Sequence, residues 1–227
     1  MEVVHCVGGA ASPLLANIYL HEVVDQWFVR DVQPRLKGRS FMVRYADDMV
    51  LCFENEADAR VVLDVLPKRF ARYGLKLHPE KTRLVRFDSP NRKGGDPGTF
   101  DFLGFTHHWG RTLRGKWAVK RRTASSRFTR AVKRVADWCR RHRHEPVRVQ
   151  QRDLNAKLRG HYGYYGITGN SAALGRFRQA VQRVWYKWLA RRSQRRITWE
   201  RFNEILSRFP LLPAKAIHSV LASGANP

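Results

Sequence analysis

The stretch FMVRYADDMVLCF, residues 41–53, places two adjacent aspartates between two hydrophobic runs. Residues 41–46 and 49–53 are rich in residues that favour β-strands, so the stretch predicts two strands joined by a tight hairpin turn. Asp47 and Asp48 then lie at the turn, where Asp is one of the few residues besides Gly that tolerates a positive φ. Abutting carboxylates repel each other, and a divalent cation would relieve that repulsion. The stretch alone leaves open a metal site and an ordinary acidic turn.

Hydrophobic periodicity predicts further elements on both sides of the hairpin. Ser12 and Pro13 are typical of a helix start, and apolar side chains continue at helical spacing to about Phe28. A second helix is predicted over residues 56–73, with Gly74 as its stop. The pattern then predicts short strands at 75–77 and 82–87, a strand at 100–106 and a turn within 107–117. Beyond residue 120 it predicts basic helices at 126–142, 150–158 and 172–192.

Charge is distributed very unevenly along the 227 residues. The formal net charge is +24 and the pI about 11.1, which indicates a polyanionic partner such as nucleic acid. Residues 1–108 contain 15 Lys and Arg against 14 Asp and Glu, whereas residues 109–227 contain 28 against 5. The polyanion is therefore expected to bind mainly to the second half.

The three cysteines, Cys6, Cys52 and Cys139, form no CxxC pair, so the sequence predicts neither a zinc ribbon nor a disulfide framework. Reduced thiols indicate an intracellular protein, and we expect a cytoplasmic location in a bacterial or organellar-type host. No run of about 18 apolar residues occurs, and the start of the chain lacks the features of a signal peptide. No membrane partner is expected.

The tetrapeptide YADD, residues 45–48, resembles the metal-binding motif of reverse transcriptases. Its surroundings extend the resemblance. GGAASPLLANIYL at 8–20 is similar to the preceding motif, which contacts template and nucleotide, and LHPEKT at 77–82 is similar to the motif that follows. FLGF at 102–105 resembles the hairpin that grips the primer.

The second half resembles the maturase region of group II intron-encoded proteins. The segments that carry this resemblance are RGHY at 159–162, YYGITGN at 164–170, RRSQ at 191–194 and Trp199. The resemblance implies an α+β fold, with a partial reverse-transcriptase palm at 1–108 and an all-helical thumb and maturase domain at 109–227. It implies RNA-directed DNA polymerase and intron maturase activities. The implied partners are group II intron RNA, an RNA/DNA primer–template and deoxynucleotides, with Mg²⁺, or Mn²⁺, as cofactor.

The resemblance also assigns roles to particular residues. Asp47 would be a catalytic metal ligand, and Asp48 its catalytic partner, either as a second metal ligand or beside the ligand. Nucleotidyl transfer uses two metal ions about 3.5–4 Å apart. Lys81 resembles the lysine proposed as general acid for the leaving group, although a solvated lysine after a turn is the simpler alternative. The implied nucleotide and template pocket comprises Gly8, Gly9, Ser12, Pro13, Asn17, Tyr45 and Ala46. The implied primer grip comprises Leu103, Gly104 and Phe105.

Cationic side chains recur along the helix expected at 172–192. Such a stripe can follow phosphates, and the alternative is an ordinary solvated helix face. The predicted RNA-binding residues are Arg121, Arg122, Lys157, Arg159, Arg176, Arg183, Lys187, Arg191, Arg192, Arg195 and Arg196. Tyr162, Tyr164 and Tyr165 could stack on unpaired bases or belong to the core.

A third carboxylate, which palm polymerases need on a separate strand, has no recognisable counterpart. Glu2 is the only acid ahead of the Gly-Gly motif, and Asp25 and Asp31 are expected to be surface charges. The Pro-Gln that usually precedes Gly-Gly is replaced by Cys6-Val7. We therefore expect the C-terminal portion of a longer protein, inactive in polymerisation alone. The alternatives are a non-catalytic splicing factor that binds intron RNA and an inert remnant.

Overall fold

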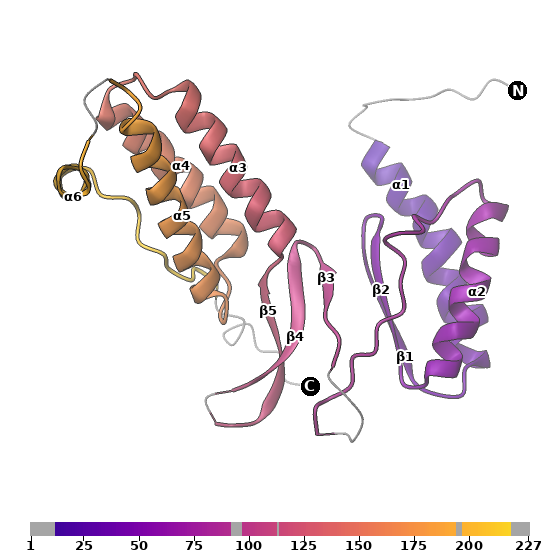
Figure 1. Ribbon diagram of the computed structural model, residues 1–227. Coiled ribbons are helices and arrows are strands. Elements are labelled where there is room, and N and C mark those ends of the chain that lie inside the picture. Colours follow the sequence, from indigo (N-terminus) through magenta and orange to yellow (C-terminus); the bar gives the residue numbers. More distant parts are fainter. Residues whose placement is uncertain (1–11, 92–96, 113, 194–196, 219–227) are drawn as a thin grey trace, which may run out of the picture. The chain divides into compact units, whose positions relative to one another are not determined.

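The structure is a computed structural model that describes residues 12–91, 97–112, 114–193 and 197–218 (Figure 1). The chain forms two compact units, Met1–Asp88 and Ser89–Pro227, each with its own hydrophobic core. Within the described residues, six α-helices and two small antiparallel sheets confirm the expected α+β class. The compact units meet at Asp88 and Ser89, and the domain boundary expected at 108–109 stays a prediction.

The first unit begins with a helical path longer than its sequence pattern indicated. Helix α1 (Ser12–Leu20) continues into π-helical η1 (His21–Gln26) and η2 (Phe28–Val32) and a 3-10 turn, η3 (Gln33–Arg35). The expected end at Phe28 is therefore wrong. The wider π-helical turn brings residues five apart onto one face, and Val23 and Phe28 are both buried. Leu36 has extended backbone angles and ends the path.

The hairpin forms as predicted from strands β1 (Ser40–Tyr45) and β2 (Asp48–Phe53). Tyr45 pairs with Asp48, which leaves a turn of two residues, Ala46 and Asp47. The residue with positive φ is Ala46, at 53°, so the expectation that an aspartate occupies this conformation is wrong. One face of the hairpin, which includes Met42 and Leu51, packs on the core of the first unit.

Helix α2 (Glu56–Arg72) confirms the second predicted helix, and Gly74 follows with a φ of 69°. Its Val62, Leu66 and Phe70 are buried in the same core that the hairpin covers. At its N-terminal end, the buried Asp58 accepts hydrogen bonds from the backbone N–H groups of Lys37 (3.1 Å) and Gly38 (2.9 Å). These bonds fix the segment that leads into β1.

The strands expected at 75–77 and 82–87 do not form in this described part of the chain. A strand needs a partner strand for its backbone groups, and the two sheets of the described residues include neither segment. Leu75 and Leu77 instead pack against the first core, and the Leu75 N–H donates to the carbonyl of Phe70 at 2.9 Å. The alternation of apolar and polar residues at 75–77 therefore reflects packing of one face on the core and not pairing in a sheet.

The second unit opens with a three-stranded antiparallel sheet, β3 (Phe100–Phe102), β4 (Phe105–Arg111) and β5 (Trp117–Thr123). The single strand expected at 100–106 is wrong, because Leu103 and Gly104 have φ angles of 49° and 78° and turn the chain back. Two successive positive φ angles are typical of a tight hairpin. The turn expected at 107–117 is correspondingly shorter, because β4 runs on to Arg111.

Helices α3 (Ser125–Arg141), α4 (Val147–Tyr165) and α5 (Ser171–Leu189) form a bundle, and α6 (Trp199–Arg208) was not predicted (Figure 1). Helix α4 passes Gly160 and Gly163, so the helix end expected at 158 is wrong. Buried Leu158 and Tyr162 explain why the helix continues, since packing outweighs the low helix propensity of glycine. No helix among the described residues is long and apolar enough to cross a membrane.

Candidate active site and nucleic-acid surfaces

The acidic turn of the first unit presents both carboxylates outward. Asp47 lies in the turn, Asp48 begins β2, and both side chains are exposed. Among the described residues neither carboxylate forms a hydrogen bond or an ion pair. The neighbouring Tyr45 is 67% exposed. The turn therefore offers oxygen ligands on an open surface, where a hard cation could approach.

The side chain of Arg44 anchors this turn through hydrogen bonds. Its guanidinium donates to both carboxylate oxygens of Asp25, from Nε to Oδ1 at 2.7 Å and from Nη2 to Oδ2 at 2.6 Å. Its Nη1 donates to the carbonyl of Ala46 at 2.8 Å. Because Ala46 directly precedes Asp47, this bond anchors the strained residue of the turn. One arginine thus connects η1, β1 and the acidic turn.

The expectation that Asp25 is a surface charge is wrong. The side chains of Asp25 and Arg44 are only 23% and 11% exposed. The hydrogen bond from Arg44 holds the pKa of Asp25 below its ordinary value, although burial acts in the opposite direction. The same bond raises the pKa of Arg44. A bidentate pair of this kind is stronger than an exposed ion pair because its geometry is fixed and its charges are less screened.

Asn17 joins the same network, since its Oδ1 accepts a hydrogen bond from Arg44 Nη1 at 3.0 Å. The structure therefore brings two predicted pocket residues, Asn17 and Ala46, to one guanidinium. Ser12 and Pro13 are exposed in the first turn of α1, without a comparable contact among the described residues. Gly8 and Gly9 lie outside the described residues.

The carboxylates at the turn are the kind of ligand that a divalent cation prefers, but they are fewer than a closed metal site needs. Asp47 and Asp48 supply oxygen ligands, which Mg²⁺ and Mn²⁺ prefer. Across the described residues, no group of three or more His, Cys, Asp or Glu lies close enough to hold a metal. Lys81 is exposed in a turn in which its backbone N–H donates to the carbonyl of His78 at 3.1 Å. Its role as general acid stays a prediction.

In the second unit, tyrosines of α4 support the hairpin predicted to grip a primer. Tyr164 Oη donates to the carbonyl of Leu103 at 2.9 Å, and the Tyr164 ring stacks on Phe105 with centroids 5.9 Å apart. A Cβ on Gly104 would lie 2.9 Å from Tyr165 Oη. Glycine is thus required at this position both by its φ and by close approach. Tyr164 and Tyr165 serve the hairpin, and Tyr162, at 4% exposure, belongs to the core.

Most of the predicted RNA-binding cations that the structure describes are exposed. Arg121 pairs with His107 across the sheet, and its charge adds to the effect of burial, which lowers the pKa of His107. Arg192 is half-buried and donates to the carbonyl of His144 at 3.1 Å. Arg195 and Arg196 lie outside the described residues. The exposed cations are Arg122, Lys157, Arg159, Arg176, Arg183, Lys187 and Arg191.

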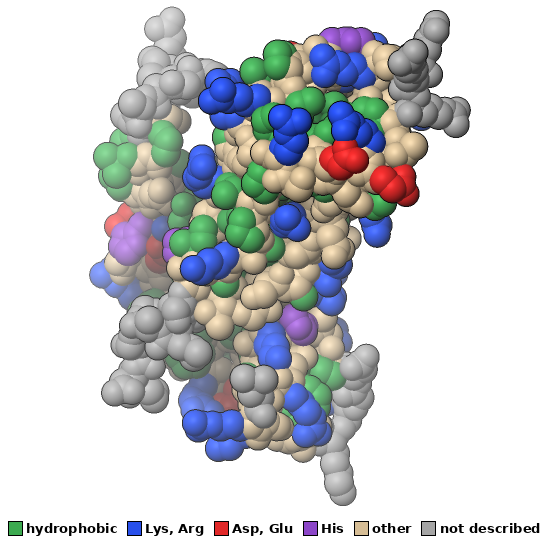
Figure 2. Space-filling view, turned by 90° about the vertical axis from the view of Figure 1, so that its left-hand side faces the viewer, with side chains coloured by type: hydrophobic (Ala, Val, Ile, Leu, Met, Phe, Trp, Pro, Cys, Tyr) green, Lys and Arg blue, Asp and Glu red, His purple; other side chains and the backbone are tan. Residues whose placement is uncertain are grey.

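The surface in Figure 2 carries many more Lys and Arg side chains than Asp and Glu. The excess of cationic side chains on this face is consistent with the sequence, in which residues 109–227 contain 28 cationic and 5 acidic residues. So few acids cannot neutralise the cations by pairing. A large excess of exposed positive charge therefore remains available to a polyanion.

An acidic hairpin on an α+β unit and a strongly basic helical unit together define a protein suited to nucleic acid. Residues 2–107 match the family model described as reverse transcriptase (RNA-dependent DNA polymerase). The match supports a reverse transcriptase domain and, in general terms, RNA-directed DNA polymerase activity, with template and primer binding and dependence on a divalent metal. No curated protein matches the chain.

Proposed function

We propose that this chain is a group II intron-type reverse transcriptase and maturase polypeptide, in which Asp47 and Asp48 are metal ligands. One observation carries the catalytic part of the proposal. The two exposed carboxylates, one in the turn that Arg44 anchors and one directly after it, lie within the segment that matches reverse transcriptases. Divalent ions bound there would activate the primer 3′ hydroxyl and neutralise the leaving pyrophosphate.

The residues around the turn have supporting tasks in this proposal. Arg44 fixes the backbone carbonyl of Ala46 and thereby the orientation of the next residue, Asp47. It also orients the amide of Asn17, whose carbonyl oxygen accepts from the guanidinium and whose NH₂ group is left to face a nucleotide. Because the described residues supply fewer than three acids at the turn, we expect no primer extension by this chain alone.

The metal site is tested by Mn²⁺ binding, which needs no polymerase activity. Paramagnetic broadening of backbone amide signals in the hairpin should follow Mn²⁺ addition and should disappear in Asp47→Asn. Asp64→Asn, an exposed acid on α2, is the matched control and should leave the broadening unchanged. Equal broadening in both variants, or broadening that is not centred on the hairpin, would contradict the assignment.

The basic unit is proposed to bind intron RNA, and this part favours a second candidate function, a splicing factor without polymerase activity. The observation behind it is the charge of residues 109–227, with 28 Lys and Arg against 5 Asp and Glu. Binding through several phosphates should weaken steeply with salt. Salt-insensitive binding, or none at about 50 mM salt, would refute RNA binding through this surface. Splicing of the intron RNA by a chain that shows no Mn²⁺ binding at the hairpin would favour the second candidate.

A further inference from the structure

A single buried side chain joins three elements of the second unit. Asn170 is 1% exposed and precedes α5 as its N-cap residue. Its Oδ1 accepts a hydrogen bond from the backbone N–H of Thr123, the last residue of β5, at 3.0 Å. Its Nδ2 donates to Thr123 Oγ1 at 2.9 Å and to the carbonyl of Tyr165, the last residue of α4, at 2.8 Å. The sheet, α4 and α5 therefore meet at one amide group.

The direction of this amide is unusual for its place in the chain. An N-cap asparagine ordinarily uses its side-chain oxygen to accept from a backbone N–H of the first helical turn. Asn170 forms no such side-chain bond, and only its backbone carbonyl accepts from the N–H groups of Ala173 (3.0 Å) and Leu174 (3.2 Å). Its side chain bonds instead to residues 5 and 47 positions away. A local preference that is overruled in this way indicates a role set by the tertiary structure.

The network requires an amide at this position and not a carboxylate. The Thr123 N–H is a donor and has to face Oδ1, whereas the Tyr165 carbonyl is an acceptor and has to face Nδ2. Aspartate has the same shape, but it would place an oxygen against the Tyr165 carbonyl. Thr123 is 7% exposed, so water cannot readily replace the bonds that such a change removes.

The residues that Asn170 holds are connected to the hairpin between β3 and β4. Thr123 pairs with Phe105 across β4 and β5. The N–H of Ala124 donates to the carbonyl of Gly104 in the hairpin turn at 2.9 Å. Ala124 is 1% exposed and links β5 to α3. The bonds of Asn170 therefore fix the end of β5, which in turn holds both a strand and the turn of the hairpin.

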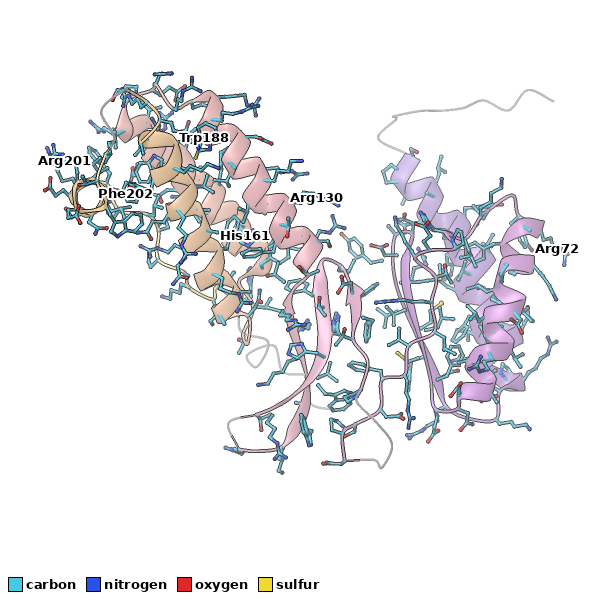
Figure 3. The ribbon with its side chains drawn as sticks, viewed as in Figure 1. Arg72, Arg130, His161, Trp188, Arg201 and Phe202 are labelled. Atoms are coloured by element: carbon cyan, nitrogen blue, oxygen red, sulfur yellow. The ribbon has the colours of Figure 1, made fainter. Side chains whose placement is uncertain are left out.

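The end of α4 contacts the same hairpin. The Tyr165 ring lies against Phe105, with centroids 5.3 Å apart and an angle of 63° between the rings. The centroid of the His161 ring lies 4.7 Å from that of Tyr165, and His161 stacks on Phe177 of α5 at 3.7 Å. Figure 3 shows His161 within the bundle of α3, α4 and α5. Tyr165 thus carries the hairpin contact into the packed bundle, and Asn170 holds its backbone.

The loop between α4 and α5, which ends at Asn170, is fixed by a distant segment. The backbone N–H groups of Ile217 and His218 donate to the carbonyl of Gly166 at 2.7 and 2.8 Å. The N–H of Thr168 donates to the carbonyl of His218 at 3.0 Å. These bonds hold the loop from which the Asn170 side chain extends, so the amide is pre-organised for its three bonds to β5 and α4.

We propose that Asn170 is a positioning residue for primer binding. Its amide fixes the hairpin that carries the predicted primer grip, Leu103, Gly104 and Phe105, against α4 and α5. The end of a primer and the nucleic acid on the basic helices of this unit then keep a constant spacing. The inference rests on the proposed nucleic-acid function and makes it more specific. Asn170 touches no substrate in this role and acts through the hairpin.

Two pairs of variants test the joint. Asn170→Asp keeps the oxygen that accepts from Thr123 and removes both donations from Nδ2. Asn203→Asp, on the exposed surface of α6, is its matched control, because it changes the charge by the same amount. Thr123→Val removes only the hydroxyl that accepts from Asn170 and suits a strand, so it should fold. Thr123→Ser restores that hydroxyl and is the conservative variant.

The binding assay compares two partial duplexes with the same number of nucleotides. One has a recessed 3′ end, as a primer has, and the other has a recessed 5′ end. Contacts to phosphates alone cannot distinguish them, because their charges are equal. Measured by fluorescence anisotropy, the unmodified chain should prefer the recessed 3′ end by about fivefold, the value of one net hydrogen bond. The preference should disappear in Asn170→Asp and Thr123→Val, and it should remain in Asn203→Asp and Thr123→Ser.

Hydrogen exchange shows whether the effect passes through the hairpin. The Ala124 amide, which donates to Gly104, reports opening of the joint. Its exchange should be at least about fivefold faster in Asn170→Asp and Thr123→Val than in their controls, since each loses at least one net hydrogen bond. Unchanged exchange in Asn170→Asp and Thr123→Val would overturn the positioning role.

The ratio of the two affinities separates positioning from stability. A partly unfolded variant would bind both duplexes more weakly and keep the ratio. A full preference in Thr123→Val, or one that Thr123→Ser does not restore, overturns the role of Asn170. Equal binding of both duplexes by the unmodified chain overturns the inference and leaves nucleic-acid binding intact. Absence of any binding overturns the proposed function as well.

Discussion

Replacement of Arg44 should loosen the acidic hairpin specifically. Arg44→Met removes both of the arginine's hydrogen bonds to Asp25, at 2.6 and 2.7 Å, and leaves the partly buried carboxylate with the contact to His21 Nδ1 at 3.1 Å. Hydrogen bonds to charged groups contribute about 1.5–3 kcal/mol each, and the exposures of 23% and 11% reduce this by solvent screening. At about 1 kcal/mol per bond, the hairpin should lose about 2 kcal/mol against local opening. Water can replace the bonds to Asn17 and Ala46, so they add little.

Hydrogen–deuterium exchange measures this opening directly. A loss of about 2 kcal/mol predicts roughly 30-fold faster exchange of the β1 and β2 amides. The amides of α5, in the other unit, provide a reference within the same sample. Arg60→Met removes an exposed ion pair to Glu56 on α2 and should change exchange by less than about twofold. Equal exchange of the hairpin in the two variants would refute the anchoring role of Arg44.

The pKa of Asp25 gives a second check on the same pair. Because its pKa in the folded chain is below the ordinary 3.8, the pair stabilises the fold fully above that value. The stabilisation is lost as the pH falls through the lowered pKa. Asp25→Asn should remove this acid dependence of hairpin exchange and should itself cost about 1–2 kcal/mol. An unchanged acid profile in Asp25→Asn would contradict the assigned pairing.

Three further predictions concern the second unit. The pKa of His161 is lowered to about 4 in the folded chain, so as the pH falls the imidazole is protonated in the unfolded chain before it is in the folded one. The free energy of unfolding should therefore fall between about pH 6.5 and 4, by at most about 1.4 kcal/mol per pH unit. Urea titrations should show this pH dependence in the unmodified chain and not in His161→Phe. Burial raises the pKa of the Cys139 thiol to about 12, so this thiol should be unreactive in the folded chain. In a Cys6→Ser variant, iodoacetamide should modify the exposed Cys52, and Cys139 should react only on unfolding. Mass spectrometry that finds Cys139 modified first would contradict its burial. Gly104→Ala should cost about 1–2 kcal/mol because of the φ of 78° and the Tyr165 hydroxyl, whereas Gly163→Ala inside α4 should be neutral or stabilising in the same urea titration.

Local patterns predicted those elements whose signals are complete within a short segment. The hairpin at 41–53 and the helix at 56–73 formed close to their expected bounds, because strand alternation, helical spacing and the Gly74 stop are all encoded nearby. The charge difference between the two halves was also evident from composition. The alternating residues at 75–87, in contrast, form no strand in the described structure, because strand formation depends on a distant partner that alternation cannot report.

The sequence by itself determined the acidic pair, the tight turn that carries it and the excess of positive charge downstream, since each depends on residue type and short spacing. The tertiary structure decided which groups act together. Asp25 looked like a surface acid until the fold placed it on Arg44, nineteen positions further along the chain. The rings of His161 and Phe177 likewise stack only because α4 packs against α5. Such contacts come from the packing of distant segments, and no local pattern encodes them.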